Sequence, residues 1–560
     1  MSHLGLMQVM ASWGLWVSAV SLLLLCPRKN LSPLGKGWRS WSVRPVGSSL
    51  LVAFTATGIC LSVGLGHWPA PRAHDEHAYL LLSDTFAHGR LTNPTHPLPA
   101  AFESPYLIFS PTYSSKYPPA SSLFMAIGQR LFGVPLVGVW LGFALASLAT
   151  LWMLRAWLPP RWALVGALLA TAHVHIAAAP IFSWSNTYWG GSIAMLGGAL
   201  LFGAMRRVMR RPSIVDSMLL GVGLVLMANT RPFEGLIASL FAAAALLAWL
   251  IGSNRFSLGR VLLTLVLPTC VPLVAGALLM GVYNRAVTGS ALRMPYMHHE
   301  EIYGVAPLFL WQSPKPAKQI ENPRLSEYQN FWAVRQYTRQ QTLEGYWEGF
   351  ERKWSWIYRF YLPLFWFYLV PLIPFTWTNR WALFASSTIL LTLGVGALCT
   401  WFLPHYVAPL VPLWFFLVTS LFRKAYVAFR ESKLGRAVTI GVIVLVMMTQ
   451  AMVLPLGPDK RDRFNWERER CRRYFESQPG RHLVIVRYRP GDDIDDEWVY
   501  NGADLFGDKV LWAHDLGREP NAELMRYYFD RTTWLVVPSG DDGRLEVTKE
   551  YTPWKPTSLQ

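Results

Sequence analysis

Charged residues are scarce in this chain. They make up 15% of its 560 residues, whereas a soluble globular domain carries roughly 25%. Acidic residues are the scarcer kind: there are 34 against 51 basic ones, and only 14 of the acids precede residue 456. The hydrophobic residues, 52% of the chain, come in long uninterrupted blocks. This combination excludes an ordinary soluble enzyme and predicts an α-helical polytopic membrane protein.

Cysteine is also scarce, with five residues in the whole chain. Four fall in apolar blocks and the fifth, Cys471, stands alone near the C-terminal end, so the sequence predicts no disulfide framework. The excess of basic residues gives a net charge of +17. Because basic residues beside membrane spans usually report topology or contact with anionic lipid, we expect membrane lipid as a partner and no nucleic acid.

Twelve apolar stretches are long enough to cross a bilayer. The first follows no basic residue and precedes no small-residue cleavage site, so we interpret it as a span and not as a signal peptide. A shorter run at 118–132 contains Gln129 and Arg130 and is better suited to a helix lying at the membrane surface. The twelve stretches are 7–26, 48–66, 134–154, 162–180, 189–205, 213–229, 235–253, 261–283, 356–375, 382–403, 406–422 and 437–455.

Basic residues mark six of the connections between these stretches. The six hold 19 Lys and Arg against a single acid, Glu431. The positive-inside rule therefore places them in the cytoplasm and both termini outside. Two long loops, 67–133 and 284–355, then lie on the external face, where we expect the chemistry. The six connections are 27–47, 155–161, 206–211, 254–260, 376–381 and 423–436.

The C-terminal segment has a different composition, with 17 basic and 20 acidic residues between 456 and 560. Its pattern predicts a small external α/β domain, separate from a transmembrane domain over 1–455. The expected elements are a charged amphipathic helix at 459–475, strands at 483–488, 510–514 and 533–538, and a helix at 520–529.

Asp75 and Glu76 follow the second predicted span, at the start of a helix predicted over 76–88. The pair could simply supply an N-cap and a first-turn acid for this helix. A carboxylate at the end of a span, beneath a large loop, is equally well placed to act as a general base, and one residue can do both. His74 and His77 flank the pair and are candidate metal ligands. Because adjacent helical positions point in different directions, we do not favour a metal or any other cofactor.

Lys116 and Tyr117 lie further along the same loop, directly before Pro118 and Pro119. Two prolines suit the start of the predicted surface helix. Lys116 could bury only its apolar stem and extend its ammonium group to the interface. Alternatively, it could hold a lipid phosphate as a point charge.

Three short connections on the same predicted face hold further candidates. The segment 183–191 is aromatic and polar, and it could also be part of an interfacial aromatic belt. Arg231 needs a counter-charge, either Glu234 or a bound anion. His405 and Tyr406 form the third connection. Because all three connections meet the face that carries Asp75, we favour a functional role for each.

The order of these motifs carries a family resemblance. An Asp-Glu pair closing a span, then Lys-Tyr-Pro-Pro, then a short amphipathic run ending Leu-Phe-Gly, resembles the GT-C superfamily of glycosyltransferases. The branch is that of bacterial aminoarabinose transferases and protein O-mannosyltransferases, glycosyltransferase families 39 and 83. The resemblance covers about residues 45–300 and, more loosely, the spans to 422. It implies a GT-C-like fold of about 12 transmembrane helices.

The resemblance also implies a function. Such an enzyme moves a hexosyl or pentosyl group from a polyprenyl-phosphate-linked donor to a glycolipid, glycan or protein acceptor, at the external face of the cytoplasmic membrane. The reaction would be a single displacement with inversion at the anomeric carbon. Asp75 matches the catalytic carboxylate, with Glu76 its neighbour, and Lys116 matches the residue that meets the donor phosphate. We add Arg231, His405 and Tyr406 to the phosphate site, and Tyr117, Asn186, Tyr188, Trp189 and Glu234 to substrate binding.

Three other functions are also compatible with many membrane spans and with charged residues on the external face. A transporter or flippase for a lipid-linked sugar tends to show repeated halves and charges at the membrane midplane, whereas the ionisable residues here concentrate at one face. A polymerase or ligase for lipid-linked saccharides would not predict an essential carboxylate at the end of an early span. A non-catalytic assembly protein could use the C-terminal domain for docking.

Overall fold

The chain is mostly helical, with one small sheet in its C-terminal unit. A computed structural model describes residues 37–38, 40–64, 68–71, 73–176, 183–252, 257–361, 373–374, 379–452, 460–539 and 545–549. The predicted span at 7–26 and most of the one at 356–375 lie outside these residues.

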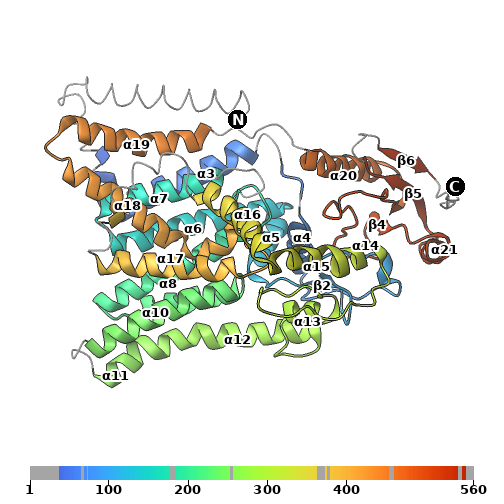
Figure 1. Cartoon of the computed structure of the whole chain (residues 1–560), viewed down its shortest axis with the longest axis horizontal. Helices are drawn as coiled ribbons and strands as arrows, with labels where there is room; N and C mark the ends of the chain where they lie inside the picture. Colours follow the sequence, from blue (N-terminus) through green and yellow to red (C-terminus); the bar gives the residue numbers. More distant parts are fainter. Residues whose placement is uncertain are drawn as a thin grey trace.

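Long apolar helices lie side by side and roughly parallel in one slab (Figure 1). Within the described part of the chain, seven helices are long and apolar enough to cross a membrane. The total of twelve spans stays a prediction. The seven are Pro45–Ser62 in α3 (Pro45–Gly64), α6 (Pro135–Trp157), α8 (Gly191–Arg210), α10 (Pro232–Gly252), Leu258–Thr288 (α11 Leu258–Val261, η3 Leu262–Val266 and α12 Leu267–Thr288), α17 (Arg380–Ala397) and Pro404–Ala428 (η8 Pro404–Leu410 and α18 Val411–Ala428).

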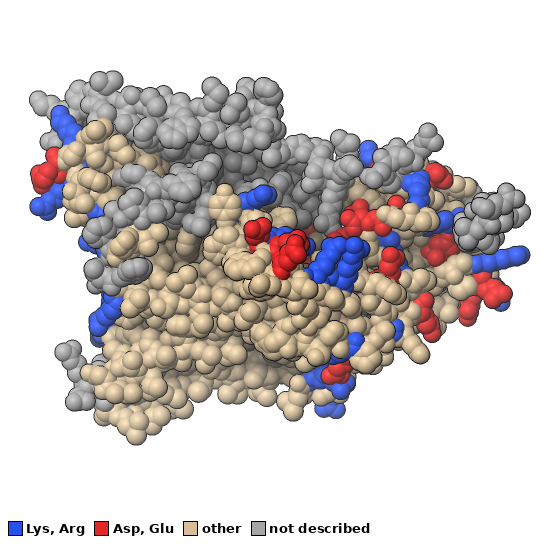
Figure 2. Space-filling view, in the orientation of Figure 1, with Lys and Arg blue, Asp and Glu red and all other residues tan. Residues whose placement is uncertain are grey.

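Three further helices fall on predicted apolar stretches. They are α7 (Pro160–Ile176), the shorter apolar helix α9 (Ile214–Ala228), and α19 (Lys433–Met452). On the face shown in Figure 2, the middle of the slab carries almost no charge; one end carries mainly basic residues with a single acidic patch, and the other carries many of both signs. The mainly basic end agrees with the prediction that six basic connections lie on one side of the membrane. The membrane side on which each end lies stays a prediction.

Close backbone contacts set the positions of two short elements, η8 and the helix at 120–132. A Cβ at Gly198 of α8 would lie 1.8 Å from the carbonyl oxygen of Pro409, so only glycine lets α8 approach η8 this closely. A Cβ at Gly138 of α6 would lie 1.9 Å from the carbonyl oxygen of Phe124 in α5 (Ala120–Phe132). These contacts fix η8 and α5 against the membrane helices.

The helix α5 has the features predicted for a membrane-surface helix. Its 13 residues span about 20 Å, less than the hydrocarbon core of roughly 30 Å. One side packs on α6, and the other exposes Leu123, Ile127 and Leu131, which recur every four residues. This apolar stripe of α5 would face lipid if the helix lies flat at the bilayer surface.

The two predicted external loops contain short elements instead of open loop. The first holds α4 (His74–Ala87), η1 (Pro99–Ala101), β1 (Leu107–Ile108) and β2 (Ser114–Ser115) as well as α5. The second holds α13 (Pro295–Ile302), α14 (Pro323–Ser326), η4 (Glu327–Trp332), α15 (Ala333–Thr338), η5 (Arg339–Gln341) and α16 (Leu343–Tyr361). These elements lie between the slab and the C-terminal unit (Figure 1).

The C-terminal unit has the predicted α/β pattern. Its sheet has the order β4-β3-β5-β6; β3 pairs in parallel with β4 and β5, and β6 runs antiparallel to β5. Phe475 of α20 packs against Val484 and Trp512 of the sheet to form the core. The elements are α20 (Lys460–Ser477), β3 (Arg481–Val486), β4 (Val510–His514), α21 (Arg518–Tyr527), β5 (Arg531–Val537) and β6 (Glu546–Lys549).

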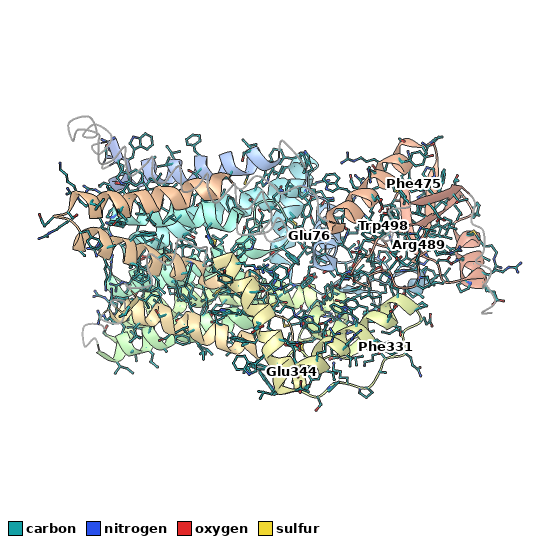
Figure 3. The ribbon with its side chains drawn as sticks, turned by 45° about the horizontal axis from the view of Figure 1, so that its top comes forward. Glu76, Phe331, Glu344, Phe475, Arg489 and Trp498 are labelled. Carbon is teal, nitrogen blue, oxygen red and sulfur yellow. The ribbon has the colours of Figure 1, made fainter. Side chains whose placement is uncertain are left out.

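The segment 495–503 joins the C-terminal unit to the short elements. Arg324 of α14 forms an ion pair with Glu497 at 3.2 Å. The backbone N–H of Ala503 donates to Asp84 Oδ2 of α4 at 2.7 Å. Figure 3 shows Glu76 at the boundary between the slab and this unit, in which Phe475, Arg489 and Trp498 lie. The C-terminal unit is therefore docked beside the start of α4.

Candidate functional site

Asp75 lies at the start of α4, next to the hydroxyl group of Tyr117. The helix begins at His74 and its N-cap is Ala73, so the prediction that Asp75 caps the helix is wrong. Asp75 occupies the first turn instead, where the helix dipole favours a carboxylate. Its side chain is half-buried, and the Tyr117 hydroxyl donates a hydrogen bond to its Oδ1. One carboxylate oxygen is thus oriented by the protein.

Tyrosine rings surround this carboxylate. Tyr117 stacks on Tyr79 with ring centroids 4.5 Å apart, and Tyr106 meets Tyr117 edge-on at 5.9 Å. Burial raises the pKa of Tyr79 to about 12; the charge of Arg231 opposes this shift and that of Asp75 adds to it. Burial and the charge of Asp75 also hold the pKa of Tyr117 well above its usual value. The rings therefore stay protonated at neutral pH and can donate hydrogen bonds.

Lys116 is buried beside the same rings. Its ammonium group lies 4.0 Å from the centroid of Tyr106 and 4.7 Å from that of Tyr296. Its Nζ also forms an ion pair with Glu300 Oε1 at 3.2 Å. Only 6% of Lys116 is exposed, so the alternative in which its ammonium group extends to the interface is wrong.

Glu300 was not predicted from the sequence. Burial disfavours its ionised form, but the charges of Lys116 and His299 outweigh burial and lower the pKa of Glu300 to about 2. His299 Nδ1 lies 3.2 Å from Glu300 Oε1. The signal available in the sequence was the scarcity of acids before residue 456, since each acid there is a candidate partner for a buried cation.

Arg231 lies over the ring of Tyr406, with its guanidinium carbon 4.2 Å from the ring centroid. The Tyr406 hydroxyl lies within electrostatic reach of both Arg231 and Asp75. Glu234, in the first turn of α10, is buried and acts electrostatically on Arg231. Glu234, the predicted counter-charge, therefore lies within electrostatic reach of Arg231. The face of the Tyr406 ring also contacts the guanidinium group.

His405 is fully buried in η8 and stacks on Trp189, with ring centroids 4.9 Å apart. Neither ring nitrogen has a hydrogen-bond partner among the residues that the structure describes. The charge of Arg231 acts on His405. The connections at 183–191, 229–234 and 404–405 are thus brought together, as the sequence predicted.

Glu76 supports one of these connections. It is 2% exposed, and its Oε1 accepts a hydrogen bond from the backbone N–H of Tyr188 at 2.8 Å. It therefore points to the segment 183–191, while Asp75 pairs with Tyr117. Asn186 in this segment is half-buried, and its Oδ1 has no partner within the described ranges.

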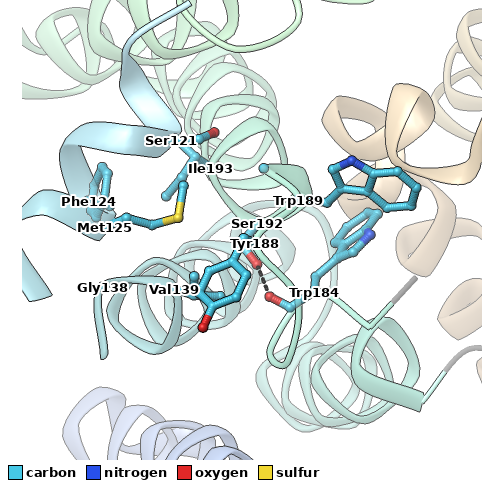
Figure 4. A pocket seen from close by; sticks show the side chains of 11 residues that line it. Ser121, Phe124, Met125, Gly138, Val139, Trp184, Tyr188, Trp189, Ser192 and Ile193 are labelled. Carbon is cyan, nitrogen blue, oxygen red and sulfur yellow. Dashed lines mark hydrogen bonds between the residues drawn. The ribbon is translucent and has the colours of Figure 1, made fainter. Parts of the chain in front are cut away.

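A small cavity of about 20 Å³ lies beside this segment (Figure 4). Tyr188 and Trp189 line it together with Phe124 and Met125 of α5. The hydroxyl of Ser192 donates to the carbonyl oxygen of Trp184 at 3.1 Å and closes the turn. The cavity is largely apolar and has room for only about one water molecule, so it is too small to hold part of a substrate.

His74 and His77 contact the C-terminal unit. His74 Nδ1 lies 2.5 Å from the hydroxyl of Tyr500, and the ring of His77 stacks on that of Tyr500 at 4.0 Å and 3°. Burial, the charge of Arg468 and that of His74 hold the pKa of His77 well below its usual value, so it is neutral. Among the residues described, no three or more His, Cys, Asp or Glu side chains form a group that could hold a metal ion.

The combined arrangement joins one carboxylate to two cations. Asp75, Lys116 and Arg231 come from three separate segments and share a space walled by tyrosines. A carboxylate with one oriented oxygen can accept a proton from a nucleophile. Buried cations at the opposite side of such a space can stabilise a developing anion.

No family model matches the chain, and no curated protein matches it. Among solved structures, it is similar to ArnT from Cupriavidus metallidurans bound to undecaprenyl phosphate, at 15% identity over 89% of this chain and 93% of that one, with a TM-score of 0.45. It is also similar to the archaeal oligosaccharyltransferase AglB from Archaeoglobus fulgidus, in complex with an inhibitory peptide and a dolichol-phosphate. That match has 12% identity over 90% of this chain and 74% of that one, with a TM-score of 0.45. Identities this low leave the function to be inferred from the site itself.

Proposed function

We propose that the chain is a GT-C-type glycosyltransferase of the cytoplasmic membrane. It would move a sugar from a polyprenyl-phosphate-linked donor to an acceptor hydroxyl or amine at the external face. The observation that carries this proposal is the half-buried Asp75, oriented by Tyr117, in one tyrosine-walled space with Lys116 and Arg231.

Asp75 would act on the acceptor. Tyr117 occupies Oδ1, which leaves Oδ2 for the acceptor's hydroxyl or amine group. The acceptor oxygen or nitrogen attacks the anomeric carbon of the donor sugar, and the bond from that carbon to the phosphate oxygen breaks. The acceptor's proton passes to Asp75, and the configuration at the anomeric carbon inverts. Glu76 would act as a positioning residue, because it holds the turn that carries Tyr188.

Lys116 and Arg231 would act on the leaving group. The donor phosphate is a diester with one negative charge, and it leaves as a monoester with about two. Cations fixed in a space with little water stabilise such developing charge strongly. His405 lies near Arg231 with both ring nitrogens unpartnered in the described chain, so it can add a hydrogen bond to the phosphate. A phosphate leaving group needs little protonation, so a second carboxylate acting as general acid is not required.

The test compares variants in cells that lack the gene. Membranes from cells complemented with the wild type, Asp75→Asn or Lys116→Ala are analysed by mass spectrometry for lipid-linked sugars and surface glycans. Glu344→Gln, which alters an exposed acid on α16, is the matched control. We expect Asp75→Asn to lack one glycan and to accumulate its polyprenyl-phosphate sugar at normal protein levels, with Glu344→Gln like the wild type. Full complementation by Asp75→Asn would reject the catalytic assignment and favour transport or assembly.

A further inference from the structure

A second, larger cavity lies outside the space around Asp75. It is a cleft of about 400 Å³ between α4 and α5 on one side and α20 and β4 on the other. We call it the Arg468 cleft. Its polar lining includes Asp84, Gln129, Arg468, Arg472, Asn501 and Lys509.

Tyr500 forms the boundary between the Arg468 cleft and the space around Asp75. It lines the cleft, its ring stacks on His77, and its hydroxyl contacts His74 beside Asp75. The charge of Asp75 also acts on the Tyr500 hydroxyl. Tyr500 therefore connects the lining of the cleft to His74, the residue that directly precedes the proposed general base.

The lining has the chemistry of hydroxyl recognition. Arg468 donates to the carbonyl oxygens of Trp498 and Tyr500 at 2.8 and 2.7 Å and has no carboxylate within ion-pairing distance in the described chain. Lys509 donates to the backbone oxygen of Glu476 and likewise has no ion pair there. Arg472 pairs with Glu469 at 2.8 Å. Cations, carboxylates and amides all line the cleft, as suits the many hydroxyl groups of a saccharide.

The edge of the sheet in this cleft is closed to a peptide strand. β4 is an edge strand, and a peptide could extend the sheet there by pairing with its free backbone groups. However, Asn501 already accepts from the N–H of Trp512 at 2.8 Å and donates to its carbonyl oxygen at 2.9 Å. The side-chain amide thus takes the place that a peptide backbone would need.

The cleft also lies close to the predicted membrane surface. Gln129 of α5 and Pro135, the first residue of α6, belong to its lining. The apolar stripe of α5 lies on the same helix as Gln129. A ligand in the cleft would therefore lie at the level of lipid headgroups.

We propose that the Arg468 cleft binds the saccharide part of the acceptor and presents its reactive hydroxyl or amine past Tyr500 to Asp75. This inference rests on the proposed function and adds the acceptor class: a saccharide, either the headgroup of a glycolipid or part of a glycan, and not a polypeptide.

The test is direct binding by the full-length protein in detergent, carrying a fluorescent label. It is applied to an array of bacterial envelope saccharides, each printed free and as a lipid-anchored form, and to a peptide array. The cleft variant combines Arg472→Ala with Lys509→Ala. The control variant combines Arg470→Ala with Arg526→Ala, two exposed cations outside the cleft. We expect the wild type to bind a saccharide, and the cleft variant to bind it at least tenfold more weakly, while the control variant is unchanged.

Each alternative result has a definite meaning. Binding of only the lipid-anchored form identifies a glycolipid, and equal binding of the free form identifies a glycan; both support the inference. It is overturned if no saccharide binds, if only peptides bind, or if the cleft variant binds as well as the control. Asp75→Asn is included because it should still bind the saccharide. If Asp75→Asn complements in cells but saccharide binding depends on the cleft, the catalytic proposal alone has failed.

Discussion

The hydroxyl of Tyr500 lies 2.5 Å from Nδ1 of His74, although 426 positions separate the two residues. His74 is the first residue of α4 and directly precedes Asp75. The C-terminal unit thus holds the helix end that carries the candidate general base. In this arrangement the position of Asp75 depends on whether that unit is docked.

Replacing Tyr500 with Phe removes this hydrogen bond and keeps the ring stacked on His77. A buried ring nitrogen left without a partner costs about 1–3 kcal/mol. We expect Tyr500→Phe to slow sugar transfer about tenfold while the protein still reaches the membrane. The rate of transfer in isolated membranes and the thermal unfolding of the purified protein measure the two effects. Tyr527→Phe, at an exposed tyrosine of α21, is the control; equal rates for both variants would reject a positioning role for Tyr500.

Replacing Glu300 with Gln removes the partner of the Lys116 ammonium group. A buried cation that loses its partner destabilises a protein by roughly 3–5 kcal/mol. Because a bound phosphate would restore an anion beside Lys116, we expect polyprenyl phosphate to raise the melting temperature of Glu300→Gln more than that of the wild type. Differential scanning fluorimetry with and without the lipid measures this difference. Glu301→Gln, at the exposed neighbouring acid, should respond like the wild type. A smaller lipid response of Glu300→Gln would show that the phosphate binds elsewhere.

Asp508 predicts a pH dependence of stability. Burial, followed by the charges of Asp84 and Asp504, raises the pKa of Asp508 from 3.8 to about 6, while Arg531 and His88 oppose the shift. The folded protein therefore holds this proton more tightly than the unfolded chain, so Asp508 makes the protein less stable as the pH rises from about 4 to 6. This rise in the pKa of Asp508 corresponds to at most about 3 kcal/mol of the free energy of unfolding.

Asp508→Asn should remove the loss of stability that accompanies rising pH. We expect the variant to be more stable than the wild type above pH 6 and to lose the advantage near pH 4, measured by denaturant unfolding of the purified protein. Asp530→Asn changes an exposed acid of the same unit and serves as the control. A profile of Asp508→Asn parallel to that of the wild type would contradict the assignment.

Gly198 should tolerate no side chain. In Gly198→Ala the Cβ would lie 1.8 Å from the Pro409 carbonyl oxygen, so α8 and η8 must separate and displace His405 and Tyr406. We expect most of the folded protein and nearly all transfer activity to be lost. Gly394→Ala is the matched control on α17, because a Cβ there meets nothing within 4 Å. The control should be unchanged or up to about 1 kcal/mol more stable. Yields of monodisperse protein in detergent compare the two.

Local patterns predicted most of the architecture. The apolar stretches, the short amphipathic helix α5 and the alternating strands of the C-terminal unit depend on residues close together in sequence. The structure has elements at those places wherever its described residues cover them, which leaves out 7–26 and most of 356–375. The sequence predicted that this helix begins at residue 76, because Asp75 is a common cap residue. In the structure α4 begins at His74, after Ala73, which has the extended backbone that precedes the helix. Boundaries of this kind are set by backbone geometry that the residue type alone does not define.

The site was predicted only in part, for a different reason. Asp75, Lys116 and Arg231 stand out because charge is rare in the membrane part of the chain. Glu300 is one of the same rare acids, but its partner Lys116 lies 184 positions away, and Tyr500 carries no charge and contacts His74 across 426 positions. The functional roles of all these residues stay predictions until the variants above are measured.

The apolar stripe of α5 has a consequence for how far the reaction lies from the bilayer. If α5 lies flat in the membrane surface, its depth sets the depth of α4, because the Ser122 hydroxyl donates to the Tyr79 carbonyl oxygen at 2.9 Å. Asp75, on the same helix as Tyr79, would then lie close to the membrane surface. Chemical groups further from the membrane than this would remain unmodified, whatever their affinity for the protein.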